Sequence, residues 1–313
     1  MAIFEIKNSY AKRIKLSEFS TEKKLQKLVE KNLKEIFDCR FIATEFSTGN
    51  IHSGRIDTLA ISEDNNPVII EYKKTASSDQ INQSLYYLHW IQDHKGDFQL
   101  EANKALNEIV RVDWSEIRVI CLAPEFKKYD IHAVQVMNAN IELWQYKFYE
   151  NSILSIEEVF RRTKSLNSIK TQPMNGKSPI MVEAGKKAAL TRKTAVYYIE
   201  DHYKYLNKSI LDLFNTIRDY IISLDDSIEE SPKKNYIAYK TSQNFVCLET
   251  HKRKIKLYLK VKPDEIMPFP IQGRNVRNIG HFGTGDFELT INNLKDFEET
   301  KRFIKDAYNN IGG

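Results

Sequence analysis

The chain has 313 residues, enough for two domains with separate cores, and a formal net charge of +5. Its three cysteines are scattered, without a Cys-x-x-Cys pair or a nearby histidine, which argues against a disulfide framework and a zinc site and favours a reducing cytoplasm. No signal peptide precedes the first predicted helix and no apolar stretch approaches the ~20 residues that span a bilayer, so we expect a soluble, cytoplasmic protein.

Residues 21–37 are predicted to form the first helix, because apolar side chains recur there with a helical period. The apolar positions are Leu25, Leu28, Val29, Leu33, Ile36 and Phe37. Glu30 lies at the edge of this apolar arc, so its carboxylate can lean from the buried side toward a neighbouring site. Because the helix carries many other charges, a plain surface role for Glu30 is equally open.

A β-hairpin is predicted next, from two Ile- and Val-rich runs, 54–62 and 67–74, which the turn-forming stretch 63–66 separates. Side chains alternate between the two faces of a strand, so Glu71 and Lys73 share one face while Tyr72 points to the other. Asp57, at the start of the first strand, is thereby expected beside Glu71 and Lys73.

This grouping of two acids and a lysine has a definite chemistry. Two carboxylates can hold a hard divalent cation, and an adjacent lysine can orient or deprotonate a water for attack on a phosphodiester. The alternative is a solvated strand face or a cross-strand ion pair, which gives the same Glu-x-Lys pattern.

Residues 78–94 are predicted to form a helix, capped by Ser78 or Asp79. Gln83 and Tyr87 lie four apart, one helical turn, and begin ten residues after Lys73. A surface helix with one polar and aromatic face would look the same.

The remaining elements of this half complete a mixed sheet between helices. Residues 118–123 form a nearly continuous apolar run, as in a buried strand, residues 127–137 suit a helix, and residues 141–146 alternate like a further strand.

Asp57, then Glu71-x-Lys73, then Gln83-x-x-x-Tyr87 resembles the PD-(D/E)xK nuclease superfamily, in the subgroup of RecB- and NucS-type nucleases. The resemblance covers residues 20–150 and implies a restriction-endonuclease-like α/β fold. It also implies that the substrate is DNA more than RNA, and that the protein acts in restriction, phage defence or repair. It implies Mg²⁺ or Mn²⁺ bound by Asp57, Glu71 and the Tyr72 backbone carbonyl. Lys73 would orient water, Gln83 and Tyr87 would position the metal or the strand, and Glu30 would be a further acid.

Residues 161–195 are predicted to be a basic linker between domains 1–160 and 196–313. This segment holds nine Lys or Arg residues and one acid, a net charge of +8, so the rest of the chain sums to −3. Such a segment can follow a nucleic-acid backbone or merely stay soluble and mobile. The expected contacts to nucleic acid are Arg55, Lys74, Lys186, Lys187, Arg192 and Lys193.

The second half is predicted to be a smaller α+β domain, with a helix within 198–224 and strands at 236–239, 245–249 and 255–261. The last strand alternates apolar residues with a row of four lysines and Tyr258. That row is either a surface that follows phosphates or the solvated face of an edge strand.

Residues 274–286 combine three glycines with Arg274, Arg277 and His281, so the loop around Gly283 is a candidate anion or ligand site. A tight hairpin is the simpler account. Residues 207–311 resemble a family of small C-terminal domains of unknown function, some labelled predicted transport proteins.

The sequence thus predicts a metal-dependent nuclease. A catalytically silent nucleic-acid-binding protein, and a nuclease regulated by a nucleotide on the second domain, remain alternatives. Cutting both strands of a duplex would favour a homodimer.

Overall fold

The computed structural model describes residues 2–49, 54–75, 79–137, 139–161, 197–266 and 268–312. The chain divides into two compact units, Met1–Ser168 and Ile169–Gly313, each with its own hydrophobic core.

The first unit is built on a seven-stranded sheet with the order β3-β8-β7-β6-β5-β4, and β9 also pairs with β8. Strands β6, β7 and β8 are parallel neighbours, whereas the other pairs are antiparallel. Every residue of β6 and β7 is buried, as strands covered on both faces require. The strands are β3 (Leu16–Ser17), β4 (Cys39–Ser47), β5 (Arg55–Ser62), β6 (Pro67–Tyr72), β7 (Arg118–Ala123), β8 (Ile141–Tyr149) and β9 (Ile153–Arg161).

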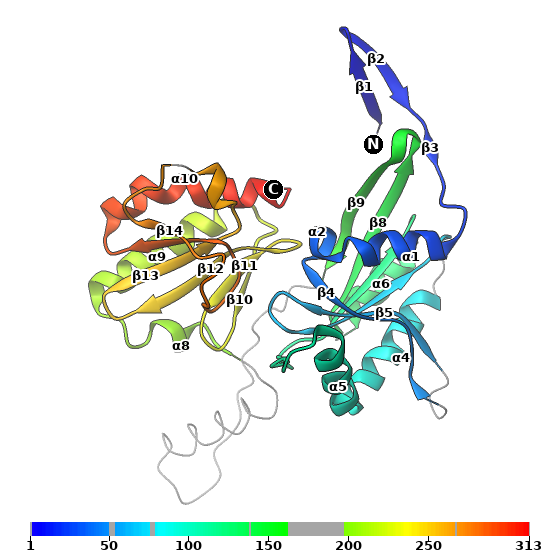
Figure 1. The fold of residues 1–313 in the computed structure, drawn as a ribbon, viewed down its shortest axis with the longest axis horizontal. Coiled ribbons are helices and arrows are strands. Elements are labelled where there is room, and N and C mark those ends of the chain that lie inside the picture. Colours follow the sequence, from blue (N-terminus) through cyan, green and yellow to red (C-terminus); the bar gives the residue numbers. More distant parts are fainter. Residues whose placement is uncertain are drawn as a thin grey trace, which may run out of the picture. The chain divides into compact units, whose positions relative to one another are not determined.

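Helices cover both faces of this sheet (Figure 1). The helices α1 (Glu22–Lys31) and α2 (Leu33–Phe37) pack on one face, and α4 (Asp79–Asp93), α5 (Lys95–Leu106) and α6 (Lys128–Val136) pack on the other. The 3-10 helix η1 (Glu150–Ser152) joins β8 to β9. The predicted α/β fold, a mixed sheet flanked by helices, is confirmed.

The first helix is shorter than predicted. Asn32 interrupts it with the non-helical angles φ −122° and ψ 25°, and its side-chain amide donates to the Leu28 carbonyl at 2.7 Å. A short polar side chain that bonds its own backbone competes with the helix, which explains the break. The predicted helix over 21–37 is therefore two helices, with Thr21 as the first N-cap.

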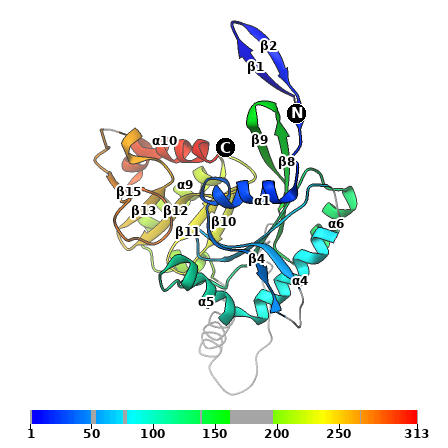
Figure 2. The same ribbon diagram turned by 45° about the vertical axis from the view of Figure 1, so that its right-hand side comes forward.

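A hairpin that the sequence analysis missed precedes the sheet. Its strands β1 (Ile3–Lys7) and β2 (Tyr10–Ile14) form a separate two-stranded sheet that extends away from the first unit's helices in both views (Figure 2). Its apolar side chains are largely exposed, so it lacks the buried pattern by which a strand is recognised.

The second unit has a six-stranded antiparallel sheet with the order β10-β11-β12-β13-β15-β14. Helices α9 and α10 pack against one face and form the core with the inward side chains of the strands. This confirms the predicted α+β unit. Its elements are α8 (Glu200–Tyr203), α9 (Lys208–Ile222), β10 (Glu229–Pro232), β11 (Ile237–Lys240), β12 (Asn244–His251), β13 (Lys254–Leu259), η2 (Pro263–Glu265), β14 (Gly273–Asn275), β15 (Phe287–Ile291) and α10 (Leu294–Asn310).

Strand β13 alternates as predicted, with Ile255, Leu257 and Leu259 in the core. Its interpretation as an edge strand is wrong, because β13 pairs with β12 on one side and β15 on the other. Tyr258, expected on the open lysine face, is only 2% exposed because residues of the loop before β15 cover it.

Two further expectations meet the limits of the described chain. The predicted linker, with Lys186, Lys187, Arg192 and Lys193, lies outside the described residues, except that Arg161 is the last residue of β9. No helix within the described ranges combines the length and apolarity needed to cross a membrane.

Candidate active site

Asp57 and Glu71 face each other where β5 and β6 end their regular pairing. The register of the two strands runs from Ile61–Pro67 to Thr58–Ile70. Beyond it, Glu71 Oε1 accepts a hydrogen bond from the Asp57 backbone N–H, and Asp57 Oδ2 accepts one from the Tyr72 N–H, both at 3.1 Å. The two carboxylates thus take hydrogen bonds that backbone carbonyls would otherwise accept, which fixes both side chains between the strands.

Both acids are poorly solvated. Glu71 is 2% exposed, and this burial, together with the neighbouring Asp57 charge, raises the pKa of Glu71 to about 9. Burial also raises the pKa of Asp57. Neither carboxylate forms an ion pair with the cationic side chains of the described residues. A buried acid beside a partly buried one, without an ion-paired cation, is costly, and a bound cation relieves this cost.

Lys73 follows β6 directly and remains attached to the sheet, because its N–H donates to the Leu122 carbonyl at 2.9 Å. Its charge lowers the pKa of both Asp57 and Glu71, which partly opposes their burial. Its ammonium lies 3.9 Å from Glu22 Oε1, and the side chain is 21% exposed. The structure therefore brings Asp57, Glu71 and Lys73 together at one end of the sheet.

The Tyr72 backbone turns toward the same place. The Lys73 N–H donates to the carbonyl of Leu122 on β7, and the Glu71 carbonyl accepts from the Gln80 side chain of α4. The Tyr72 N–H instead donates to the carboxylate of Asp57 on β5. Because the N–H and C=O of one strand residue point the same way, the Tyr72 carbonyl faces β5 and Asp57. The Tyr72 side chain points away into the core with α1 and α2.

Helix α4 presents two of the expected residues differently. Tyr87 is buried beside Gly54, and its hydroxyl accepts from the Arg55 N–H at 3.3 Å. The charges of Glu71 and Asp57 contribute to raising the Tyr87 pKa, after the larger effect of burial. Gln83 is exposed, and none of its hydrogen bonds within the described chain reaches Asp57 or Glu71.

The glutamine that holds the strand is Gln80, which is 1% exposed and donates to the Glu71 carbonyl at 2.8 Å. The sequence analysis gave Gln80 no role. Its only signal was its seven-residue spacing to Tyr87, two turns along one helix face.

Glu30 lies in an adjoining network instead of contacting the two acids. Its Oε1 accepts from the Thr58 hydroxyl at 2.7 Å and from the Gln26 amide at 2.9 Å. Gln26 is 3% exposed and also donates to the Asp57 backbone carbonyl at 2.6 Å. Glu30 is therefore joined to Asp57 through Gln26 and through the neighbouring Thr58.

Glu22 is the acid of α1 that approaches Lys73, and the sequence analysis missed it. Its second carboxylate oxygen accepts from the Lys74 N–H at 3.0 Å, and its charge contributes to the raised pKa of Asp57. Glu22 is the first residue after the N-cap Thr21, where an acid is ordinarily explained by the helix dipole alone.

The two described cations expected to contact nucleic acid flank this group. Arg55 is 69% exposed in its side chain and pairs with Glu45 at 2.7 Å. The Lys74 ammonium lies 3.5 Å from the Ser20 carbonyl.

Two carboxylates and one backbone carbonyl suit Mg²⁺ or Mn²⁺, which prefer oxygen ligands and retain several waters. Within the described ranges, no group of three or more His, Cys, Asp or Glu residues is placed to hold a metal.

In the second unit, the two arginines of the loop expected to bind an anion form ion pairs with acids. Arg274 pairs with Glu288 at 2.7 Å, and Arg277 pairs with Asp264 and Asp286. The loop also closes over the sheet. The His281 ring stacks on Tyr258 at 4.4 Å, and Gly283, with φ +82°, lies so close to Cys247 that an added Cβ would approach its Cβ to 2.6 Å.

Comparison with known proteins gives a family but no activity. The model of a domain of unknown function, DUF5655, matches residues 199–311. An uncharacterized protein of Haemophilus influenzae is 30% identical over 311 residues, covering 98% of this chain and 99% of that protein.

Two solved structures show weaker likenesses. One is an EndoMS–dsDNA2 complex, with TM-score 0.31, 16% identity, and coverage of 42% of this chain and 47% of that chain. The other is a repair endonuclease from Pyrococcus abyssi, with TM-score 0.23, 16% identity, and coverage of 41% and 49%. The chain thus spans less than half of either, and at these scores neither likeness carries the interpretation of the site.

Proposed function

We propose that this chain, which belongs to the same family as the uncharacterized protein of Haemophilus influenzae, is a Mg²⁺- or Mn²⁺-dependent endonuclease that hydrolyses phosphodiester bonds in DNA. The observation that carries the proposal is the pair of carboxylates, buried Glu71 and part-buried Asp57, held together beside Lys73 without an ion-pair partner among the described residues. Restriction, phage defence and repair are the proposed settings, in the cytoplasm, and a homodimer would allow both strands of a duplex to be cut.

The metal-binding group would be Asp57, Glu71 and the Tyr72 carbonyl. Bound there, the ion would supply Lewis acidity to a phosphoryl oxygen and a lowered pKa to a water. Glu71 must first lose the proton that its raised pKa retains at neutral pH. Gln26 and Gln80 position the two strands, because they bind the backbone carbonyls of Asp57 and Glu71.

Lys73 would act on the reacting atoms. Its ammonium lies 3.9 Å from Glu22 Oε1, and the side chain is partly exposed. It can therefore donate to a water or to a phosphate oxygen as negative charge develops on that oxygen. Tyr87, Gln83 and Arg55 would position the scissile strand. Tyr87 accepts a hydrogen bond from the Arg55 N–H next to the acids, the Arg55 side chain is exposed, and Gln83 is exposed one turn before Tyr87 on α4.

The test is cleavage of labelled single- and double-stranded DNA and RNA with Mg²⁺, Mn²⁺ or EDTA, comparing the wild type with Lys73→Met. The matched control is Lys27→Met, which removes an exposed lysine from α1, on the side of the helix that faces away from the sheet. Metal-dependent cleavage that is lost only in Lys73→Met is expected. Cleavage equal in both variants would refute the role of Lys73. Binding without cleavage in any metal would favour the silent nucleic-acid-binding alternative.

A further inference from the structure

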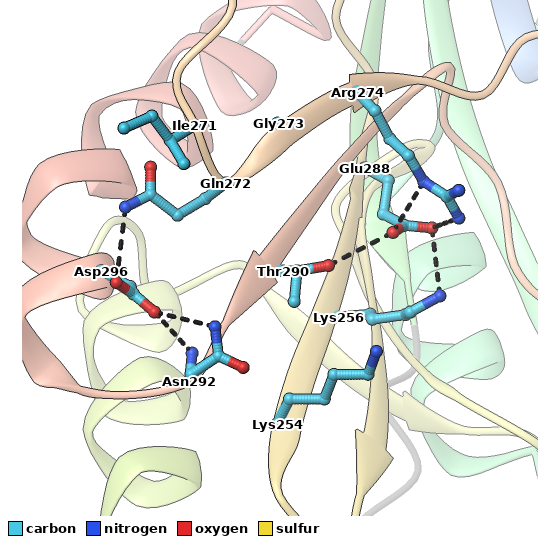
Figure 3. Close-up of a pocket in the computed structure, with 10 residues that line it drawn as sticks. All are labelled: Lys254, Lys256, Ile271, Gln272, Gly273, Arg274, Glu288, Thr290, Asn292 and Asp296. Atoms are coloured by element: carbon cyan, nitrogen blue, oxygen red, sulfur yellow. Dashed lines mark hydrogen bonds and ion pairs between the residues drawn. The ribbon is translucent and has the colours of Figure 1, made fainter.

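The second unit contains a polar cavity of about 540 Å³ on the sheet face opposite α9 and α10 (Figure 3). Its volume lies within the range of small-molecule sites, about 300–1,000 Å³. The cavity is bordered by β13, β14, β15 and the start of α10. It is distinct from the Asp57–Glu71 site, because all the residues that line it belong to the second unit.

Glu288 organises one wall of this cavity. Its carboxylate accepts two hydrogen bonds from Arg274, at 3.0 and 2.7 Å, and lies 3.3 Å from the Lys256 ammonium. A planar carboxylate that binds a guanidinium through two hydrogen bonds fixes its orientation. One buried acid thus holds two cations at the cavity wall, as Figure 3 shows.

The positive charge exceeds what Glu288 neutralises. Lys254 lies two residues before Lys256 on the same face of β13, and among the described residues it has no acidic partner. Arg274 uses Nε and Nη2 for Glu288, so Nη1 donates to none of the described side chains, and 53% of its side chain is exposed. Free donors therefore remain on both sides of the cavity.

The other acid of the cavity, Asp296, is already satisfied. It lies in the first turn of the 17-residue helix α10, accepts from the Asn292 N–H at 2.8 Å and from the Asn292 side-chain amide at 3.1 Å. Its charge is further offset by the helix dipole. The cavity accordingly has three cations, two acids that are both engaged, and unoccupied donors.

We propose that this cavity binds a phosphate group, from a free nucleotide or from a nucleic-acid strand, through Lys254 and the free face of Arg274. Lys256 and Arg274 are held in place by Glu288 before a ligand arrives, so little ordering accompanies binding. Thr290 and Asn292 add polar groups at the cavity wall for the rest of the ligand. This proposed site differs from the predicted anion site in the segment 274–286, because it lies on β13 and β14, and Arg274 belongs to both.

The experiment uses the full chain in EDTA, so that no hydrolysis interferes, with calorimetric titration of inorganic phosphate, a set of mononucleotides and a short single-stranded oligonucleotide. Lys254→Gln removes the free cation without disturbing Glu288. Lys252→Gln is the matched control, because Lys252 is exposed in the adjoining turn and does not line the cavity. We expect about tenfold weaker binding in Lys254→Gln, because one charge-assisted contact is lost. Lys252→Gln should bind like the wild type.

The probe whose affinity falls in Lys254→Gln shows whether the phosphate belongs to a free nucleotide or to a nucleic-acid strand. If a mononucleotide binds and weakens in Lys254→Gln, the ligand is a free nucleotide. If only the oligonucleotide does so, the ligand is a strand. The proposal is overturned if no probe binds, or if Lys254→Gln and Lys252→Gln bind every probe equally. Nuclease activity does not enter either outcome, so this proposal and the proposed function stand or fall separately.

Discussion

Two buried glutamates, one in each unit, have the same exposure and opposite chemistry. Glu71 and Glu288 are both 2% exposed. Burial would raise the pKa of Glu288, but Arg274 and Lys256 outweigh it and the pKa is lowered. Burial, together with the neighbouring Asp57 charge, raises the pKa of Glu71 to about 9.

The difference shows that burial alone does not indicate the role of an acid. A buried carboxylate that is hydrogen-bonded to cations has a structural role, because it orients those cations. A buried carboxylate beside another acid is destabilising until a cation arrives, which is the usual condition of a functional site. The comparison predicts that neutralising the two glutamates will have effects of opposite sign.

The largest expected effect is on catalysis, from Asp57→Asn. Asparagine keeps an oxygen to accept from the Tyr72 N–H but removes the charge that would bind the cation. We expect cleavage to fall at least ~100-fold with little change in thermal unfolding. Initial rates and melting curves measured on the same preparation check this. An unfolded variant would instead make Asp57 a structural residue.

Metal binding should depend on pH because Glu71 must release a proton. Below its pKa of about 9, we expect affinity for Mn²⁺ to rise with pH, up to about tenfold per unit. Calorimetry in buffers of different ionisation enthalpy measures the released proton directly. Affinity that is flat between pH 6 and 8 would show that Glu71 is already ionised in the free protein.

Glu71→Gln should stabilise the metal-free protein. Between the ordinary value of 4.5 and about 9, the folded state holds a proton that the unfolded state has lost, so stability falls as pH rises through this window. At pH 8 the substitution should therefore raise stability, by about 1–3 kcal/mol, and at pH 4 it should have little effect. Glu157→Gln, at an exposed position, is the control for melting curves at both pH values.

Glu288→Gln should have the opposite and smallest effect. It removes the charge that Arg274 and Lys256 share, and Arg274 is half exposed, so solvent replaces part of the loss. We expect a decrease of about 1 kcal/mol, seen as faster hydrogen exchange in β15. Equal signs for Glu71→Gln and Glu288→Gln would contradict the comparison between the two units.

The sequence predicted the first unit best where the period of the side chains is unambiguous. The strand 118–123 is apolar at every position after Arg118, and the hairpin that contains Asp57 and Glu71 has a clear turn. The β1–β2 hairpin could not be found, because its apolar side chains are exposed and no buried face imposes alternation.

The site could be predicted only where one local pattern determines geometry. The approach of Glu71 to Lys73 follows from strand alternation, whereas Gln26 and Glu22 reach the site through packing of α1 on the sheet. That packing depends on contacts between residues more than 30 positions apart, such as Gln26 and Asp57, for which a single sequence gives no signal. The same reason explains the misjudged position of β13, since strand order is a property of the whole sheet.

The three cysteines, all buried, give each unit an internal reporter of opening. Burial raises the pKa of Cys39 and Cys121, in the first unit, to about 12, so neither thiol reacts while the fold is closed. Cys247 is buried in the sheet of the second unit. Pulsed alkylation followed by peptide mass spectrometry would therefore time the opening of each half independently, in the unmodified chain and without an added dye.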